Sequence, residues 1–187
     1  MEQENKRRVI AIVGRPNVGK STIFNRLTGK RMAIVHSESG VTRDRIIAEG
    51  HWGSERFELI DTGGICSIDN RATTNEIENG IRQQAEAALD ECATAIMVVD
   101  IEAGVMPLDR EVAGILRKRG CRVFIAANKS DNPSMEAGAA DFECLGYPVF
   151  PVSALHNRGF EPLMEAVIAT LPAFTREIYS GAPLKVA

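Results

Sequence analysis

The stretch that most constrains the fold is a glycine-rich run from Gly14 to Ser21. Its sequence, Gly-Arg-Pro-Asn-Val-Gly-Lys-Ser, fits the pattern G-x-x-x-x-G-K-S. A β-branched run at 7–13 precedes it and predicts a buried strand, and residues 19–29 after it predict a helix that ends at Gly29. In this setting the glycines let backbone N–H groups turn inward, and the helix N-terminus adds a positive partial charge. The run therefore predicts a phosphate-binding loop; the alternative is a glycine-rich turn that binds nothing.

The rest of the chain alternates between strand-like and helix-like stretches. Two strand-like runs, 44–52 and 55–61, flank Gly53-Ser54 and predict a β-hairpin. Further strands are predicted at 94–100, 121–128 and 147–154, and further helices at 75–92, 107–120, 134–146 and 160–172. Such alternation is typical of an α/β fold. We predict a mostly parallel six-stranded sheet with one antiparallel strand and with helices on both faces.

Composition and charge exclude several other classes of protein. The 187 residues suit one domain, and a net charge of -3 with a pI of about 5.7 argues against a basic nucleic-acid binder. No apolar run is long enough to span a membrane, no signal-peptide core is present, and four widely spaced cysteines favour a reducing cytoplasm. After Leu171 the chain becomes rich in Pro, Gly, Ser and Thr. We therefore expect a domain at 1–172 and a linker at 173–187.

Asp61 ends the second strand of the predicted hairpin and is followed by Thr62, Gly63 and Gly64. Ligands of open α/β sheets bind at the carboxyl ends of the strands, where the phosphate loop also lies. Asp61 is therefore expected to hold Mg²⁺, through water, next to the Ser21 hydroxyl, while the Gly64 N–H contacts the terminal phosphate. Without the phosphate loop, an Asp-Thr-Gly-Gly turn with no ligand would be the simpler interpretation.

A second polar loop, Asn128-Lys129-Ser130-Asp131, follows the predicted strand at 121–128. The Asp131 carboxylate can accept hydrogen bonds from the N1–H and the exocyclic amine of guanine, whereas adenine offers neither donor on that edge. A site built on such bonds rejects the wrong ligand by about 10⁴-fold or more. Lys129 is expected to lay its stem along the base, and Asn128 to tie this loop to the phosphate loop. Residues 153–155 would close the pocket with a backbone N–H.

The five motifs taken together identify a family. GRPNVGKST, GVTRD, DTGG, NKSD and SAL occur in this order, and the chain therefore resembles a Ras-like P-loop GTPase. The longer stretches RPNVGKSTIFNRLTGKRMAIV, VTRDR, IDTGGI and IRQQAEAAL are similar to the first GTPase domain of the EngA (Der) family. The similarity covers about residues 8–172. Members of that family are bacterial proteins with two tandem GTPase domains and a C-terminal RNA-binding-like domain.

The resemblance implies a cytoplasmic, GTP-hydrolysing switch that acts late in the assembly of the large ribosomal subunit. Its partners would be GTP and GDP, the second GTPase domain, the RNA-binding-like domain and, through the full-length protein, large-subunit rRNA; no membrane is implied. The second GTPase domain would begin at PLKVA, residues 183–187. Thr42 would bind Mg²⁺ and sense the γ-phosphate. The chain departs from the family in having Ser39 where a proline usually stands.

Ile65 occupies the position where many GTP-hydrolysing proteins have a glutamine that orients water. The resemblance implies that a K⁺ ion supports hydrolysis instead, bound by Asn17 and by backbone carbonyls within 37–41. Such a cation compensates the charge of the phosphates, and charge compensation is much of what phosphoryl transfer requires. The implied catalytic set is Asn17, Lys20, Thr42 and Gly64. The alternative is that Ile65 marks a slow-turnover module that senses GDP and GTP.

The residues expected at the site come from all of these motifs. The expected Mg²⁺ ligands are Ser21, Thr42 and Asp61, and the expected K⁺ ligand is Asn17. The expected nucleotide contacts are Gly14, Arg15, Pro16, Asn17, Val18, Gly19, Lys20, Ser21, Thr22, Asp61, Thr62, Gly63, Gly64, Ile65, Asn128, Lys129, Ser130, Asp131, Ser153, Ala154 and Leu155. Rival interpretations are a P-loop ATPase or small-molecule kinase, against which Asp131 argues, and a tRNA-modification GTPase, which would share the K⁺ chemistry.

Overall fold

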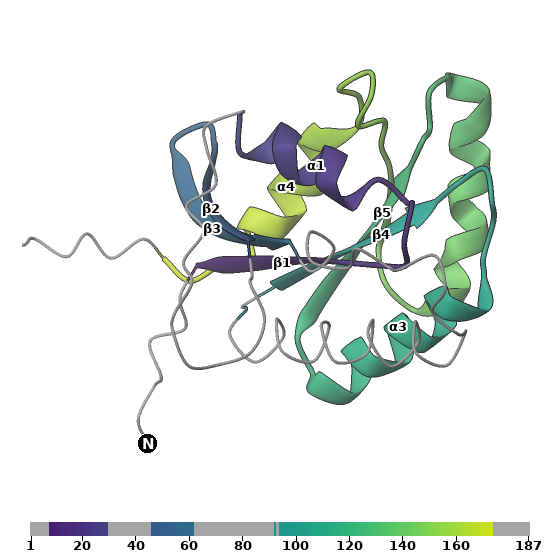
Figure 1. The fold of residues 1–187 in the computed structure, drawn as a ribbon, viewed down its shortest axis with the longest axis horizontal. Coiled ribbons are helices and arrows are strands. Elements are labelled where there is room, and N and C mark those ends of the chain that lie inside the picture. The colour runs from purple at the N-terminus through teal and green to yellow at the C-terminus, as the bar shows by residue number, and fades with distance from the viewer. Residues whose placement is uncertain (1–7, 30–45, 62–91, 93, 174–187) are drawn as a thin grey trace, which may run out of the picture.

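The computed structural model describes residues 8–29, 46–61, 92 and 94–173 (Figure 1). These residues form one six-stranded sheet in the order β2-β3-β1-β4-β5-β6. The strands are β1 (Val9–Val13), β2 (Ile46–Trp52), β3 (Glu55–Asp61), β4 (Thr94–Asp100), β5 (Arg122–Asn128) and β6 (Val149–Pro151). Neighbouring strands are parallel except in the β2–β3 hairpin, which is antiparallel. The prediction of a mostly parallel sheet with one antiparallel strand is confirmed.

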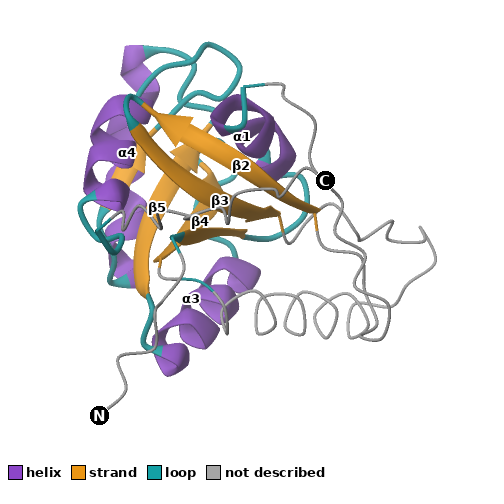
Figure 2. Ribbon diagram, turned by 90° about the vertical axis from the view of Figure 1, so that its left-hand side faces the viewer, coloured by secondary structure: helices purple, strands orange, loops and turns teal. Residues whose placement is uncertain are grey.

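Helices cover both faces of this sheet, as predicted. Helices α1 (Lys20–Leu27) and α4 (Phe160–Ile168) lie on one side, and α3 (Pro107–Arg119) lies on the other (Figures 1 and 2). The side of α3 also carries the 3₁₀-helix η1 (Pro133–Leu145), which packs into the same apolar cluster. Among the described helices, none is long and apolar enough to cross a membrane.

Two apolar clusters, one on each face, hold the layers together. In β1 the side chains alternate: Ile10 and Ile12 pack with α1 and α4, whereas Val9, Ala11 and Val13 pack with α3 and η1. Every residue of β1 and β4 is buried, as expected for central strands covered on both faces. The continuous apolar character of these strands in the sequence follows from this double burial.

Within the described residues each expected element is present, but β6 spans only Val149–Pro151 of the predicted 147–154, α4 ends at Ile168 rather than 172, and one helix is of another type. The stretch predicted as a helix at 134–146 forms a 3₁₀-helix of 13 residues rather than an α-helix. The α3 helix begins at Pro107 and ends before Gly120, whose φ of 66° stops it, as predicted. The expected helix at 75–92 lies outside the described residues apart from Cys92, and so does the linker after residue 173.

Candidate nucleotide-binding site

The phosphate loop follows β1 directly and passes close to two neighbouring segments. Gly14 and Gly19 have backbone φ angles of 146° and 95°, which residues with a side chain rarely adopt. A Cβ on Gly14 would lie 2.4 Å from the carbonyl oxygen of Val98, and one on Gly19 would lie 2.3 Å from Asn128 Nδ2. Glycine is therefore required at both positions by contact as well as by conformation. The predicted order of strand, glycine-rich loop and helix is confirmed.

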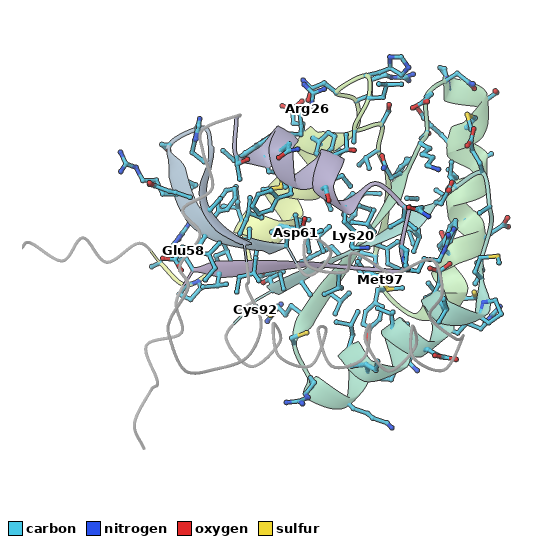
Figure 3. The ribbon with its side chains drawn as sticks, in the orientation of Figure 1. Lys20, Arg26, Glu58, Asp61, Cys92 and Met97 are labelled. Atoms are coloured by element: carbon cyan, nitrogen blue, oxygen red, sulfur yellow. The ribbon has the colours of Figure 1, made fainter. Side chains whose placement is uncertain are left out.

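Lys20 is the first residue of α1 and is buried, with 8% of its surface exposed. Its Nζ donates a hydrogen bond to the Arg15 carbonyl oxygen at 2.7 Å. The ammonium group therefore lies against the inside of the loop that it belongs to, where a phosphate bound by the loop would meet it. The labelled side chains of Lys20 and Asp61 lie on the side of the sheet that α1 covers (Figure 3).

The two predicted Mg²⁺ ligands that the structure describes are neighbours. Ser21 Oγ donates a hydrogen bond to Asp61 Oδ2 at 3.2 Å, although the two residues are 40 positions apart. Asp61 is only 2% exposed, and it lies at the end of β3 beside Ile12 of β1. Thr42, and the turn Thr62, Gly63, Gly64 and Ile65, lie outside the described residues. The roles expected for those five residues stay predictions.

Asn128 connects three segments of the site. Its Nδ2 donates to the Val18 carbonyl oxygen at 2.9 Å, and its Oδ1 accepts from the Ala154 N–H at 3.0 Å. All three residues are buried. The predicted tie between the loop at 128–131, which is the expected base-binding loop, and the phosphate loop is therefore confirmed. The second hydrogen bond, to the segment after β6, is one that sequence reasoning did not anticipate.

Ser153 acts on Asp131 through its side chain. Its hydroxyl donates to Asp131 Oδ1 at 2.6 Å and also accepts from the His156 N–H. This contact orients the carboxylate that is expected to recognise guanine. The N–H groups of Ser153 and Ala154 donate within the protein, to Arg158 and Asn128. Closure of the pocket by a backbone N–H therefore stays a prediction, and it now points to Leu155, which is 70% exposed.

Two further carboxylates surround the side chains of Arg15 and Lys129. Asp100, at the end of β4, places Oδ2 2.7 Å from Lys129 Nζ and 3.9 Å from Arg15 Nη2. Asp109, near the start of α3, places Oδ1 3.5 Å from Arg15 Nε. Asp109 is fully buried, and burial raises the pKa of its carboxyl above the usual value, although Arg15 opposes this. Arg15 therefore contributes its backbone to the phosphate loop while its guanidinium faces these acids.

Comparison with known proteins shows which family this chain belongs to. The family model described as 50S ribosome-binding GTPase matches residues 9–129, which include the phosphate loop, Asp61 and Asn128. The chain belongs to the 50S ribosome-binding GTPase family. The predicted resemblance to P-loop GTPases is thereby confirmed.

Curated relatives show which proteins of the family the chain is similar to. The GTPase Der of Brevibacillus brevis is 48% identical over 166 residues, which are 88% of this chain and 37% of that protein. The GTPase Der of Limosilactobacillus fermentum is 48% identical over 161 residues, which are 86% of this chain and 36% of that protein. The chain thus spans just over a third of the length of these curated relatives. These matches are consistent with the first GTPase domain of an EngA (Der) protein.

A solved structure of Era from Aquifex aeolicus shows the same fold. It is 24% identical, has a TM-score of 0.69, and covers 94% of this chain and 62% of the Era chain. That Era is a variant bound to GDP and AlF₄⁻. At this identity the likeness supports the architecture alone.

Sequence reasoning missed Asp100 and Asp109 in this GTPase domain. Asp100 carries the same signal as Asp61, because both are carboxylates at the carboxyl end of a buried strand. Asp109 carries a weaker one, an acid in the first turn of a helix. Neither signal reveals which cation the carboxylate contacts, since Arg15 and Lys129 come from other loops.

Proposed function

We propose that this domain binds guanine nucleotides and hydrolyses GTP to GDP and phosphate. The observation that carries the proposal is the hydrogen-bonding of Asn128, which joins the base-binding loop to the phosphate loop at one edge of the sheet. In this proposal the phosphate loop, the Asp61 carboxylate at the end of β3 and the Asp131 carboxylate contact one ligand. A ligand with both a guanine base and a polyphosphate would contact all of them.

Guanine recognition is assigned to Asp131. Its Oδ1 already accepts from the Ser153 hydroxyl, but an ionised carboxylate has about four acceptor sites and keeps capacity for further donors. The guanine N1–H and exocyclic amine are two such donors, adjacent and coplanar. Because Ser153 fixes the carboxylate before the base arrives, little ordering would remain to be done on binding.

The residues on this edge fit Mg²⁺. Ser21 Oγ and Asp61 Oδ2 are oxygen donors of the kind that Mg²⁺ takes, and they lie 3.2 Å apart, so an ion bound by Ser21 would have the Asp61 carboxylate within reach of one of its coordinated waters. Ser21 would bind the ion directly and Asp61 through water, with Thr42 as a further ligand. When bound, the ion supplies charge neutralisation at the β- and γ-phosphates. The chain's own contribution is Lys20 and the loop N–H groups, which hold the phosphates in position.

K⁺ is proposed as the replacement for the absent glutamine at Ile65. Asn17 is exposed on the phosphate loop with φ of 65°, so its amide oxygen is accessible to a cation. The carbonyls within 37–41 that would complete the ion's shell lie outside the described residues. Lys20, Thr42, Gly64 and Asn17 remain the proposed catalytic set. A slow-turnover module that senses GDP and GTP is the second candidate, because Ile65 cannot orient water by hydrogen bonding.

In the whole protein, we assign this domain to assembly of the large ribosomal subunit in the cytoplasm. The support is the family description, 50S ribosome-binding GTPase, and the relatives named GTPase Der. The proposed partners are a second GTPase domain, an RNA-binding-like domain and, through them, large-subunit rRNA.

The test of hydrolysis compares KCl with NaCl at equal ionic strength, with Mg²⁺ and GTP. A higher rate in KCl that Asn17→Ala abolishes is expected if the ion replaces the glutamine. Asn157→Ala is the matched control, because Asn157 is also exposed and has φ of 55°, so alanine has a similar backbone cost there. Equal, near-zero rates in both salts with tight GDP binding would favour the slow-turnover module.

The test of base recognition is Asp131→Asn. Losing two hydrogen bonds to a charged acceptor should weaken GDP binding by about 100-fold or more. Xanthosine diphosphate has a carbonyl in place of the exocyclic amine, so the same substitution should weaken its binding less than that of GDP, or strengthen it. Asp141→Asn, an exposed aspartate in η1, is the control and should leave both affinities unchanged. Equal binding of GDP and ADP by the unchanged protein would contradict guanine recognition.

A further inference from the structure

Asp100 lies midway between the two loops that define the nucleotide site. Strand β4 stands between β1, which leads into the phosphate loop, and β5, which leads into the base-binding loop. Asp100 is the last residue of β4 and is in register with Asn128 of β5. Its side chain is 9% exposed and accepts a hydrogen bond from the Glu102 N–H at 3.0 Å through Oδ1. The carboxylate is thus fixed in one orientation, with Oδ2 directed at the cations.

Lys129 is held at both ends by this arrangement. At the backbone, φ is 68°, a left-handed conformation that is costly for a lysine. At the tip, Nζ is 2.7 Å from Asp100 Oδ2. The aliphatic stem between these two points is therefore restricted, although 37% of the side chain is exposed. Ordering a free lysine side chain costs rotamer entropy, and part of that cost is already met before a ligand binds.

Arg15 competes weakly for the same carboxylate. Its Nη2 is 3.9 Å from Asp100 Oδ2, and its Nε is closer to Asp109 Oδ1, at 3.5 Å. Asp109 is in turn oriented by the Met106 N–H, which donates to its Oδ2 at 3.0 Å. The guanidinium is therefore anchored mainly by Asp109. Lys129 is therefore the main cation partner of Asp100, at 2.7 Å against 3.9 Å for Arg15.

We propose that Asp100 is a positioning residue for guanine nucleotides, which holds the Lys129 side chain in place as a platform for the face of the base. The inference rests on the proposed function, because a platform matters only if guanine binds beside it. In this proposal Asp100 does not contact the ligand and acts through Lys129, its shortest ion-pair partner. Its removal should therefore matter only while Lys129 is present.

The experiment is a double-mutant cycle on the 187-residue chain, read as the dissociation constant of GDP carrying a fluorescent ribose label. Asp100→Asn preserves the volume and removes the charge, and Lys129→Met preserves most of the stem and removes the ammonium. We expect Asp100→Asn to weaken binding about five-fold in the original background, as for a partly buried ion pair, and less than about two-fold in the Lys129→Met background. Glu111→Gln, on the exposed side of α3, is the control and should change nothing.

A merely structural role would give a different result. It would lower affinity by the same factor with and without the ammonium of Lys129, and that outcome overturns the inference, as does an unchanged affinity of the Asp100→Asn variant. If Asp100→Asn fails to fold, Asp100→Ser, whose hydroxyl can still accept from the Glu102 N–H, takes its place in the cycle. If the original chain does not bind labelled GDP at all, the proposed function itself fails, which the first measurement reveals separately.

Discussion

Replacing Asn128 by alanine should destabilise the domain even without nucleotide. The substitution orphans two buried groups, the Val18 carbonyl and the Ala154 N–H, which Asn128 pairs at 2.9 and 3.0 Å. Each buried polar group left unpaired costs about 1–3 kcal/mol, so the expected loss is about 2–6 kcal/mol. Domains are typically stable by only about 5–15 kcal/mol, so this loss is a large fraction of the total. The residue would then be structural as well as a proposed nucleotide contact.

The measurement is urea unfolding of the nucleotide-free protein, followed by circular dichroism. The control is Asn25→Ala, because Asn25 is an exposed asparagine in α1, and the free energy of unfolding should there stay within about 0.5 kcal/mol of the original. A loss below about 1 kcal/mol for Asn128→Ala, with an unchanged slope against urea, would refute the reasoning. It would mean that water or a backbone shift satisfies both orphaned groups.

Two other substitutions test the supports of the phosphate loop. Gly14→Ala should lower the free energy of unfolding by about 3 kcal/mol or more, because φ is 146° and the new Cβ would lie 2.4 Å from the Val98 carbonyl oxygen. The control is Gly104→Ala, where φ is 65° and no atom lies within 4 Å of the new Cβ, so the loss should be about 1 kcal/mol. Urea unfolding measures both losses, and equal values would contradict the contact argument. Asp109→Asn should change the pH dependence of stability. Burial raises the pKa of Asp109 above 3.8; the Asp100 charge adds to this rise, and the Met106 N–H and Arg15 oppose it. The folded protein therefore binds this proton more tightly than the unfolded chain, and the contribution of Asp109 to stability falls as pH rises above 3.8. Urea unfolding at several pH values should show the free energy of unfolding of Asp109→Asn rising relative to that of the original chain across that window. Two parallel curves of unfolding free energy against pH would contradict the raised pKa of Asp109.

Much of the fold could be predicted from the sequence because its signals are local. The buried runs that form β1 and β4 are continuous in the chain, and the glycines of the phosphate loop report backbone conformations at their own positions. The 3₁₀-helix at Pro133–Leu145 is predicted only as a helix, because its sequence does not reveal whether the backbone takes the tighter winding and hydrogen-bond spacing of a 3₁₀-helix. The partners of Asn128 lie 110 and 26 positions away, so its own stretch of sequence does not contain them.

By itself, the sequence determined which residues could carry the chemistry: the loop from Gly14 to Ser21, Asp61, and the run from Asn128 to Asp131. Tertiary structure decided how they are supported. The Ser153 hydroxyl on Asp131 and the Asp100 carboxylate on Lys129 join residues 22 and 29 positions apart. Such pairs depend on which strands are neighbours in the sheet. Strand order is set by burial of both faces of the whole sheet, and no local stretch of sequence contains that information.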